Sequence, residues 1–428
     1  MGKENKLFTA NYVFMIFTAI MAFSGNFMII SSTPRYCVEI GGTNSLAGIM
    51  TSLHMFAALA SRPLWGRWAD SIGRKTVFYS GVLLSMLATA GFFFSKTVGA
   101  LLLARVVFGI GYSAITTANG TIVTDLIPRE RLSEGLAFYG VASITAQAIA
   151  PPIALALYRD SFNAVLLFLT GIWLCCLLFA KLIRYDEKAL LKSHRAPEGR
   201  SAGHGGVIEK TAVRASATIT LMALAATAVS SFVVLLGADR GIENIGSFFT
   251  FSAAGLLVSR VLGASLPRRF GENRVFLLGS GLYIVSFLIL SGTYISTVAC
   301  VAGVFYGLGM GFNFPILNAM AVRNAQPHRR GAATATFNLG QDAGAIVGGL
   351  LFGGLSDLLG FTAVYVAAAG IGLIMLALYF FFAGQVGAEA GGHWQPHIDK
   401  NMFGRIAEIR GEGGDAGRNR GRPDVMIK

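Results

Sequence analysis

The sequence predicts an all-α membrane protein with twelve transmembrane helices, arranged as two six-helix bundles around a central cavity. Three observations support this fold class: the composition, twelve apolar runs, and a repeat that relates the two halves of the chain. Hydrophobic residues make up 54% of the 428 residues and charged residues only 13%, about half the ~25% of a soluble domain. A water-soluble enzyme of this composition could not hide its apolar surface. Lipid is therefore expected to surround the molecule.

Twelve apolar runs are each long enough to cross a membrane, which takes about 20 mostly apolar residues. The first six lie at Tyr12–Ser32, Ala47–Trp65, Thr76–Phe94, Val98–Val123, Gly135–Tyr158 and Ala164–Ile183. The other six lie at Ala215–Gly237, Ser247–Pro267, Val275–Gly292, Tyr294–Val322, Ala333–Phe352 and Phe361–Ala383. The first run is too long for the apolar core of a signal peptide and lacks a small-residue cleavage site, so we expect it to be retained.

Polar segments between and after these runs divide the chain into four parts. We expect a six-helix bundle at 1–184, a cytoplasmic linker at 185–214, a second six-helix bundle at 215–384 and a disordered cytoplasmic tail at 385–428. A short surface helix is expected in the linker at about 185–193. The tail is rich in Gly and charge and has no apolar face on which to fold. Its His393 and His397 have a spacing that could hold a metal on a helix, but Pro396 argues against it, and we expect no metal and no cofactor.

The Lys and Arg residues predict the orientation, because cytoplasmic loops carry them in excess. With the N-terminus inside, 21 of the 35 fall in inner segments before the tail and four fall outside, at Arg35, Lys96, Arg159 and Arg240. This predicts a multi-pass protein of the cell membrane with both termini in the cytoplasm. The net charge of +13 is then a topology signal, so no nucleic-acid partner is expected. The four cysteines have neither a disulfide-framework nor a metal-site spacing.

The two halves of the chain align on each other at an offset of about 200 residues. Ser61-Arg62 and Gly109-x-Gly111 recur 198 residues later as Ser259-Arg260 and Gly307-x-Gly309. In the same order, Pro128-x-x-Arg131 recurs as Pro327-x-x-Arg330 and Gly140 as Gly340. Six spans per half is an even number, so the halves should share one orientation and be related by an axis along the membrane normal.

The connection after the second run reads Gly66-x-x-x-Asp70-x-x-Gly73-Arg74-Lys75. It resembles motif A of the major facilitator superfamily in all five defining positions and in its place between spans two and three. The resemblance implies a gating motif, whose contacts lock the cytoplasmic side in one state and break in the other. Physically, Asp70 can accept N–H groups at a helix start and pair with an Arg. A positive-inside loop with a capping Asp is the simpler alternative, but it does not explain the ordered glycines.

Two further spans resemble motifs of the same superfamily. Leu101-x-x-x-Arg105-x-x-Phe108-Gly109-x-Gly111 is similar to motif B, with Phe108 in place of the frequent Gln. Arg105 should face a cavity or a partner, or else snorkel to the outer surface about 10 Å away. The fifth run resembles the proton-antiporter motif C in outline only, through small residues beside Pro151: Ala142, Ala146, Ala150 and Ala154. The resemblance covers residues 8–384 and is greatest to the twelve-span drug-exporter-like branch.

This resemblance implies export of a small organic molecule by proton antiport with alternating access. No GxxxxGK[ST] motif is present, which argues against ATP-driven transport. Uptake or facilitated diffusion of a sugar, nucleoside or amino acid is the alternative, and a membrane sensor or intramembrane enzyme is a remote one that would need a soluble module or clustered acids. We expect a monomer whose partners are the substrate, protons and lipid. Candidate residues of the substrate cavity are Asn26, Tyr112, Thr116, Asn119, Gln147, Tyr306, Asn313 and Asn338.

Three ionisable residues inside the spans are candidates for proton coupling: Asp342, Arg105 and His54. Asp342 lies about nine residues, or ~14 Å, into span eleven, where an ionised carboxylate is costly. It could carry the proton, neutralise a cationic substrate, or serve as a structural hydrogen-bonded acid. His54 could titrate during transport or be a packing histidine.

Overall fold

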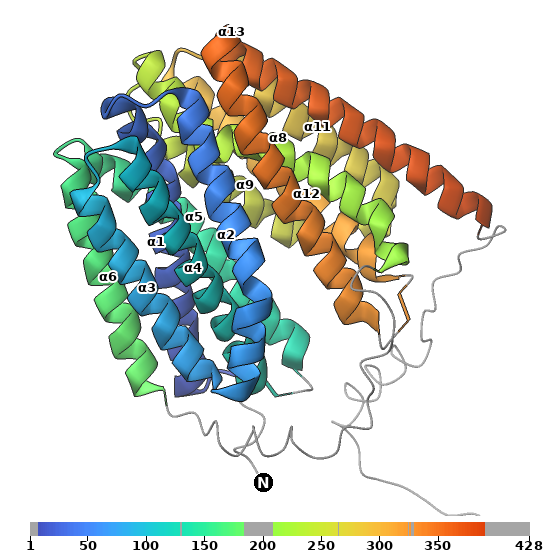
Figure 1. Ribbon diagram of the computed structural model, residues 1–428. Coiled ribbons are helices and arrows are strands. Elements are labelled where there is room, and N and C mark those ends of the chain that lie inside the picture. Colours follow the sequence, from blue (N-terminus) through green and yellow to red (C-terminus); the bar gives the residue numbers. More distant parts are fainter. Residues whose placement is uncertain are drawn as a thin grey trace, which may run out of the picture. The chain divides into compact units, whose positions relative to one another are not determined.

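The structure, a computed structural model, is helical throughout the part of the chain that it describes, with no strand there (Figure 1). The described residues are 7–128, 131–183, 209–263, 265–323, 325–326 and 329–389. The described residues up to 382 form one compact unit, and the sites discussed below all lie in it. The surface helix expected near 185–193 and the histidines His393 and His397 lie outside the described residues.

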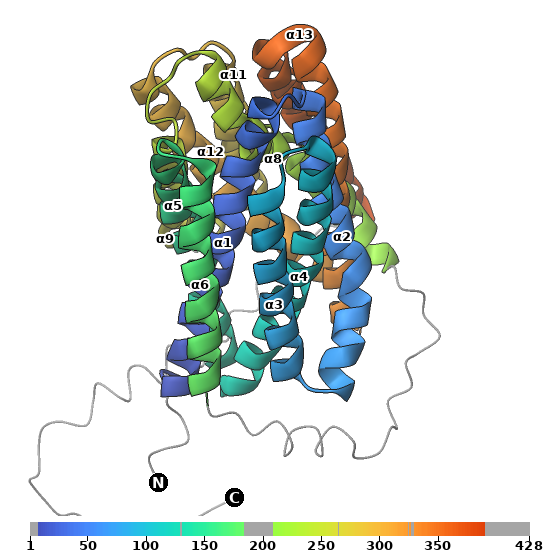
Figure 2. The same ribbon diagram turned by 60° about the vertical axis from the view of Figure 1, so that its left-hand side comes forward.

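Six helices form the first half of the compact unit: α1 (Ala10–Glu39), α2 (Asn44–Ser71), α3 (Arg74–Phe94), α4 (Val98–Leu126), α5 (Leu132–Tyr158) and α6 (Phe162–Leu182). The second half consists of η2 (Lys210–Ala212), α8 (Val213–Asp239), α9 (Ser247–Leu262), α10 (Leu266–Phe270), α11 (Glu272–Ser291), α12 (Ser296–Arg323) and α13 (Arg330–Glu389). Two helices make up α13, because Gly360 between them has a left-handed φ of 75°. Apart from the short η2 and α10, the described helices therefore correspond to the twelve expected spans (Figure 2).

Nine helices of the described residues are long and apolar enough to cross a membrane. One of them, Ala332–Phe382, contains both expected spans on either side of Gly360, so ten of the twelve expected spans are accounted for; α2 and the 16-residue α9 are not among them. One boundary was wrong. Instead of a single span over Ser247–Pro267, the helix ends at Leu262, and α10 begins at Leu266 with Pro267 in its first turn, because proline lacks the N–H that continues a helix.

Close packing of the helices makes the repeat visible. Gly109 of α4 lies against the backbone of His54 on α2, and 198 residues later Gly307 of α12 lies against the backbone of Ser252 on α9. A Cβ atom at either glycine would overlap a carbonyl oxygen of the neighbouring helix. The same relation joins Gly111 to Gly81 and Gly309 to Gly279. Small residues let membrane helices approach closely, and here they do so at equivalent positions of both halves.

The two halves are joined at the end that carries the connections expected outside the cell, which we call the outer end. Asp357, near the end of the first part of α13, accepts hydrogen bonds from the backbone N–H groups of Asn44 and Ser45 at 3.0 and 2.8 Å. These groups begin α2, and a carboxylate is favourable there because it faces unpaired N–H groups and the positive end of the helix dipole. Nearby, Nη2 of Arg159 donates to Oδ1 of Asn244 at 2.6 Å.

Below this contact, α2 and the first part of α13 pack closely. Gly48 faces the backbone of Gly349, with no room for a Cβ atom between them. Oγ of Ser52 donates to the carbonyl oxygen of Ile346 at 2.6 Å. We call the opposite end of the molecule the inner end. Between Arg62 and this end, no described residue of α2 forms a hydrogen bond or ion pair with the second half.

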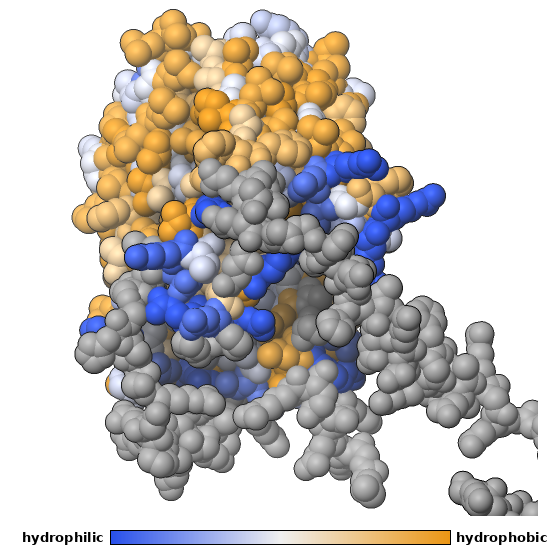
Figure 3. All heavy atoms as spheres, turned by 90° about the vertical axis from the view of Figure 1, so that its right-hand side faces the viewer, coloured by the Kyte–Doolittle hydropathy of each residue, from blue (hydrophilic) through white to orange (hydrophobic). Residues whose placement is uncertain are grey.

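The outward surface of the described helices is apolar. Large hydrophobic side chains that are more than half exposed include Leu87, Phe94, Leu103, Leu167, Val261 and Leu358. Figure 3 shows hydrophobic residues over most of one face and hydrophilic residues gathered towards its lower part. Lipid is the solvent that such a surface requires, so the protein is a multi-pass membrane protein.

The end of the linker is attached to the second half. The backbone N–H of Glu209 donates to Oγ1 of Thr336 at 2.9 Å, and its carboxylate accepts from Nε of Arg329. This hydrogen bond from the Arg329 guanidinium holds the pKa of Glu209 below its usual range. A lowered carboxyl pKa stabilises the folded state at neutral pH, and the contribution is lost only as the pH falls through the lowered value.

Candidate functional site

An ion pair between the two halves lies at the centre of the candidate site. Nη1 of Arg62 on α2 donates to Oδ2 of Asp342 on α13. The Arg62 side chain is 41% exposed and the Asp342 side chain 14%. A carboxylate is costly inside a membrane and a guanidinium partner offsets that cost. Within the described ranges this is the one ion pair that joins the halves.

One aromatic side chain of the first half, Tyr112, interacts electrostatically with this ion pair, and two further rings follow from it. Tyr112 of α4 is within electrostatic range of Arg62, Asp342 and Tyr139. The ring centroid of Phe23 on α1 lies 5.9 Å from that of Tyr139 on α5. All three rings are partly exposed, and we call them the aromatic group. Ring faces and phenol hydroxyls beside a charged pair are features of sites that bind small organic molecules.

The other two coupling candidates, His54 and Arg105, are buried inside the first half, at 0% and 1% exposure. The His54 ring centroid lies 5.7 Å from that of Phe108 and 5.9 Å from that of Tyr112. Cζ of Arg105 lies 5.9 Å from the Phe108 ring centroid. Burial contradicts the alternative in which Arg105 snorkels to the outer surface. The arginine instead lies in the helix-packing region between α2 and α4.

These two side chains have unsatisfied polar atoms. Among the described residues, neither ring nitrogen of His54 and no guanidinium nitrogen of Arg105 has a hydrogen-bond partner. His54 is also within electrostatic range of Arg62. A buried charge without a partner is costly. Because no described residue pairs with its guanidinium, Arg105 leaves an uncompensated positive charge in the part of the first half that lies beside Tyr112.

The remaining cavity candidates fall into two groups. Thr116, Gln147 and Asn338 are at least partly exposed, and Oγ1 of Thr116 donates to the carbonyl oxygen of Tyr112 at 3.0 Å. Buried in this conformation are Asn26, Asn119, Asn313 and Tyr306. The Asn313 amide lies 3.0 Å from Oγ of Ser280, and the Tyr306 ring lies 5.3 Å from that of Tyr283. The structure therefore places Asn313 and Tyr306 in the packed core of the second half, away from the ion pair.

The expected gating motif lies at the inner end, at the connection between α2 and α3. Gly66 and Asp70 belong to the last turns of α2, and Gly73, with a φ of 112°, is the residue before α3. Asp70 is exposed, and within the described part of the chain it has no hydrogen-bond or ion-pair partner. Within the described residues, this conformation shows no contact of Asp70 with a helix start or an arginine, and the gating role of the motif stays a prediction.

The basic residues of the motif do make contacts. Arg74 forms an ion pair with Asp125 at the end of α4, and both side chains are largely buried. Nζ of Lys75 donates to the carbonyl oxygen of Ile183, after α6. In this conformation the basic residues of the motif thus connect α3 to α4 and to the end of α6, while its acid contacts no partner in the part of the chain that the structure describes.

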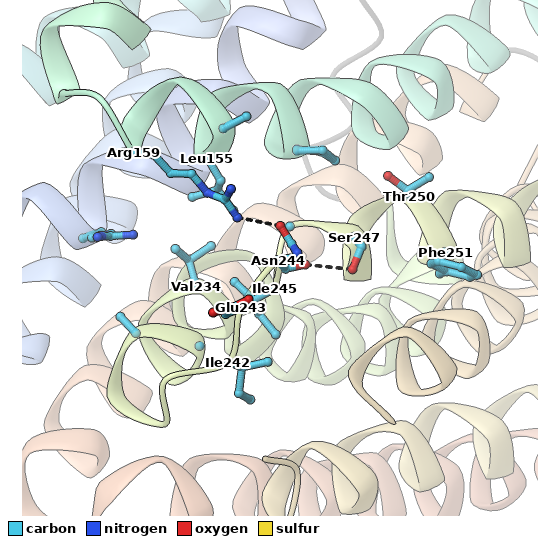
Figure 4. A pocket seen from close by; sticks show the side chains of 16 residues that line it. Leu155, Arg159, Val234, Ile242, Glu243, Asn244, Ile245, Ser247, Thr250 and Phe251 are labelled. Carbon is cyan, nitrogen blue, oxygen red and sulfur yellow. Dashed lines mark hydrogen bonds between the residues drawn. The ribbon is translucent and has the colours of Figure 1, made fainter. Parts of the chain in front are cut away.

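A separate pocket of about 660 Å³ lies between the halves at the outer end (Figure 4). Leu155 and Arg159 line it from the first half, and Val234, Asn244 and Phe251 line it from the second. Figure 4 shows Arg159 reaching across to Asn244. The sequence did not predict this pocket, because it is formed by connections and helix ends from both halves.

Comparison with known proteins identifies the family. The sequence model of the Major Facilitator Superfamily matches residues 15–266 and 215–396. The chain belongs to the Major Facilitator Superfamily. Membership confirms the resemblance drawn from the Gly66–Lys75 motif. It also agrees with the twelve helices in two groups of six.

Other members of the Major Facilitator Superfamily resemble this one over most of its length. The uncharacterized MFS-type transporter YhhS of Escherichia coli (strain K12) is 26% identical over 355 residues, which cover 81% of this chain and 85% of YhhS. The crystal structure of the nucleoside transporter NupG has a TM-score of 0.71 at 14% identity, covering 87% of this chain and 99% of NupG. A bacterial homologue of the human lysosomal transporter Spinster gives 0.69 at 15%, covering 90% and 98%. The two structures show a shared fold, and the family identifies the chain as a transporter, not an enzyme.

The sequence did not identify Arg62 of this transporter as a residue of the candidate site. The available signal was that an arginine within a span and one deep acid in the other half are each costly alone and are therefore expected to pair. Arg62, Arg105 and Arg260 all fit that description, and only the contact between α2 and α13 selects Arg62. Phe23 and Tyr139 were also missed, because aromatic residues are common in apolar runs and carry no separate signal.

Proposed function

We propose that this transporter exports a small organic molecule across the cell membrane in exchange for protons, by alternating access. The Arg62–Asp342 ion pair carries the proposal, because it joins the two halves and a single proton on Asp342 would remove the charge that holds it. With both termini in the cytoplasm, as the Lys and Arg distribution predicts, a molecule joined at its outer end is in an inward-open state.

Exchange follows if either ligand breaks the ion pair. A substrate that enters from the cytoplasm separates Arg62 from Asp342, which frees the halves to open on the other side. After the substrate has left, Asp342 takes up a proton from outside, because an unpaired carboxylate in the membrane is costly. The empty carrier then returns, and loss of the proton to the cytoplasm allows the ion pair to form again. Protons therefore enter as substrate leaves.

Two further features support this proposal. Pro151 and Pro152 lie within α5, beside the stripe of alanines that resembles the antiporter motif, which favours exchange over uptake and agrees with the drug-exporter-like branch. Both members of the ion pair come from one chain, so we propose that a monomer is sufficient for transport.

Purified protein in liposomes tests the proposal. An imposed proton gradient should drive accumulation of a transported substrate by the wild-type protein, in the direction opposite to proton flow. Asp342→Asn should fail to accumulate it, while still exchanging labelled for unlabelled substrate. Asp160→Asn, which neutralises an exposed acid after α5, is the matched control and should behave as wild type.

Two outcomes would contradict the proposal. Movement of protons and substrate in the same direction would establish symport, as expected of an uptake system. Accumulation by Asp342→Asn at the wild-type level would show that this carboxylate does not couple transport to protons.

A further inference from the structure

We propose that the substrate of this site is a small organic monoanion, an apolar or aromatic body with one carboxylate, and that Arg62 binds the carboxylate. The inference rests on the proposed function, since it places the substrate at the Arg62–Asp342 ion pair. It adds the chemical class of the substrate and the residue that selects it.

The charge balance around the ion pair favours an anionic substrate. Counting the two parts of α13 separately at Gly360, the charged residues of the described helices that lie more than five positions from a helix end are Arg62, Arg105 and Asp342. With Asp342 ionised, they sum to one positive charge. One monoanion makes this region neutral, whereas a cationic substrate would add to an excess of positive charge in a medium where charges act strongly.

A substrate can reach one member of the pair more readily than the other. Arg62 is 41% exposed and Asp342 only 14%. The contact with Asp342 uses Nη1, and among the described residues no hydrogen bond to the other N–H groups of Arg62 is found. A guanidinium offers five donors in a planar fork that fits a carboxylate. A carboxylate can therefore bind Arg62 while Asp342 is still in place, whereas the largely buried Asp342 carboxylate is less accessible to an ammonium group.

Arg105 strengthens this preference. It is 1% exposed, and none of its guanidinium nitrogens has a hydrogen-bond partner among the described residues. His54 lies beside the Arg105 main chain and within electrostatic range of Arg62. The buried charge of Arg105 therefore lies in the same region of the first half as Arg62. A fixed, buried positive charge attracts an anion at the pair and repels a cation.

The aromatic group determines the rest of the substrate. Phe23 and Tyr139 lie 5.9 Å apart between ring centroids, and Tyr112 is within electrostatic range of Tyr139 and of both members of the ion pair. These rings offer apolar faces with hydroxyl groups at their edges. An apolar or aromatic body can pack on them while its carboxylate reaches Arg62.

Matched probes of different charge test this assignment. We would measure binding of 3-phenylpropanoate, 3-phenylpropanamide and 3-phenylpropylamine to the purified transporter in nanodiscs by calorimetry, and repeat the comparison with indole and straight-chain alkyl versions of the same three groups. The carboxylates should bind at least about tenfold more tightly than their amides and amines, as expected for a charge-assisted contact. No proton gradient is present, so the result does not depend on coupling.

Two variants should shift the carboxylate affinity in opposite directions. Arg62→Gln should weaken it by about tenfold or more, whereas Asp342→Asn should strengthen it, because the competing carboxylate is gone. Arg62→Lys keeps the charge without the fork and should lie between wild type and Arg62→Gln, which separates loss of the contact from loss of the fold. Tighter binding of the amines, absence of carboxylate binding in all three series, or an unchanged affinity in Arg62→Gln would overturn the assignment.

The two proposals fail in different ways. If amines or amides bind and are still concentrated by protons through Asp342, the substrate class is wrong and the exchange mechanism stands. If carboxylates bind through Arg62 but Asp342→Asn still accumulates them, the substrate class stands and the coupling role of Asp342 is wrong.

Discussion

Arg62 and Asp342 should stabilise the molecule only when both are present. Removing one partner leaves a charge of the other half without compensation, which costs about 3–5 kcal/mol for a fully buried pair. This pair is partly exposed, so we expect each of Arg62→Gln and Asp342→Asn to cost about 1–2 kcal/mol. The double variant should recover most of the loss. Thermal unfolding in detergent measures all four proteins, and a double variant as unstable as the sum of the single variants would contradict the pairing.

Asp70 and Arg74 belong to one motif, yet they should respond differently to substitution. Asp70 has no partner among the described residues in this conformation, so Asp70→Asn should leave the melting temperature unchanged. We propose that the acid makes its gating contact in the opposite state, so the substitution should lower transport while substrate binding remains measurable. Arg74→Gln removes the ion pair with Asp125 and should lower the melting temperature. Normal transport by Asp70→Asn would contradict a gating role for the acid.

The sequence located half of the central ion pair. Asp342 stands out because an acid deep in an apolar run is rare and costly, and that argument needs no structure. Its partner could not be chosen, since the contact between α2 and α13 depends on how the halves meet. The environment of Arg105 could not be predicted from the sequence either, because the apolar run around it is equally consistent with a cavity, a lipid-facing surface and a packed interior.

At the scale of whole helices, the contact between α2 and α13 should hold the outer end closed. Gly48 has no space for a Cβ atom against the Gly349 backbone, so Gly48→Ala should push the two helices apart and raise the outward-open population. Gly171→Ala is the matched control, because a Cβ atom there meets nothing within 4 Å. Spin labels at Asp160 and Glu243, exposed residues of opposite halves, would report longer distances for Gly48→Ala only. Identical distances in both variants would contradict this role.

The helices themselves were predictable from the apolar runs, and the places where the prediction failed have local causes. The break after Leu262 comes from Pro267, which the apolar run conceals because proline does not lower its hydropathy enough to mark an end. Conversely, Gly360 separates two helices that the sequence also separated, although the expected span ended at Phe352 and the helix continues up to Gly360. The length of an apolar run predicts that a transmembrane helix exists, but single residues such as Pro267 and Gly360 determine where the helix ends.

Across the whole molecule, the glycine packing repeats in both halves, but the charged residues of the candidate site do not. The glycine contacts recur in both halves at an offset of 198 residues. At the offset of 200 that relates Gly140 to Gly340, Asp342 corresponds to Ala142, a buried apolar residue, whereas Arg62 corresponds at an offset of 198 to Arg260, which is exposed on α9. The repeat could therefore be predicted from the sequence, whereas the Arg62–Asp342 ion pair between the halves could not be predicted from the repeat.

The central claim is that protonation of Asp342 breaks its contact with Arg62 and releases the inward-open state. Distances between spin labels at Ser71 and Gln326, exposed residues at the inner ends of the two halves, test it most directly. In the wild-type protein the long, inward-open distance should dominate at neutral pH and lose population as the pH falls, because a proton neutralises the carboxylate. Asp342→Asn should show the low-pH distribution at every pH. A pH response that persists unchanged in Asp342→Asn would contradict the claim.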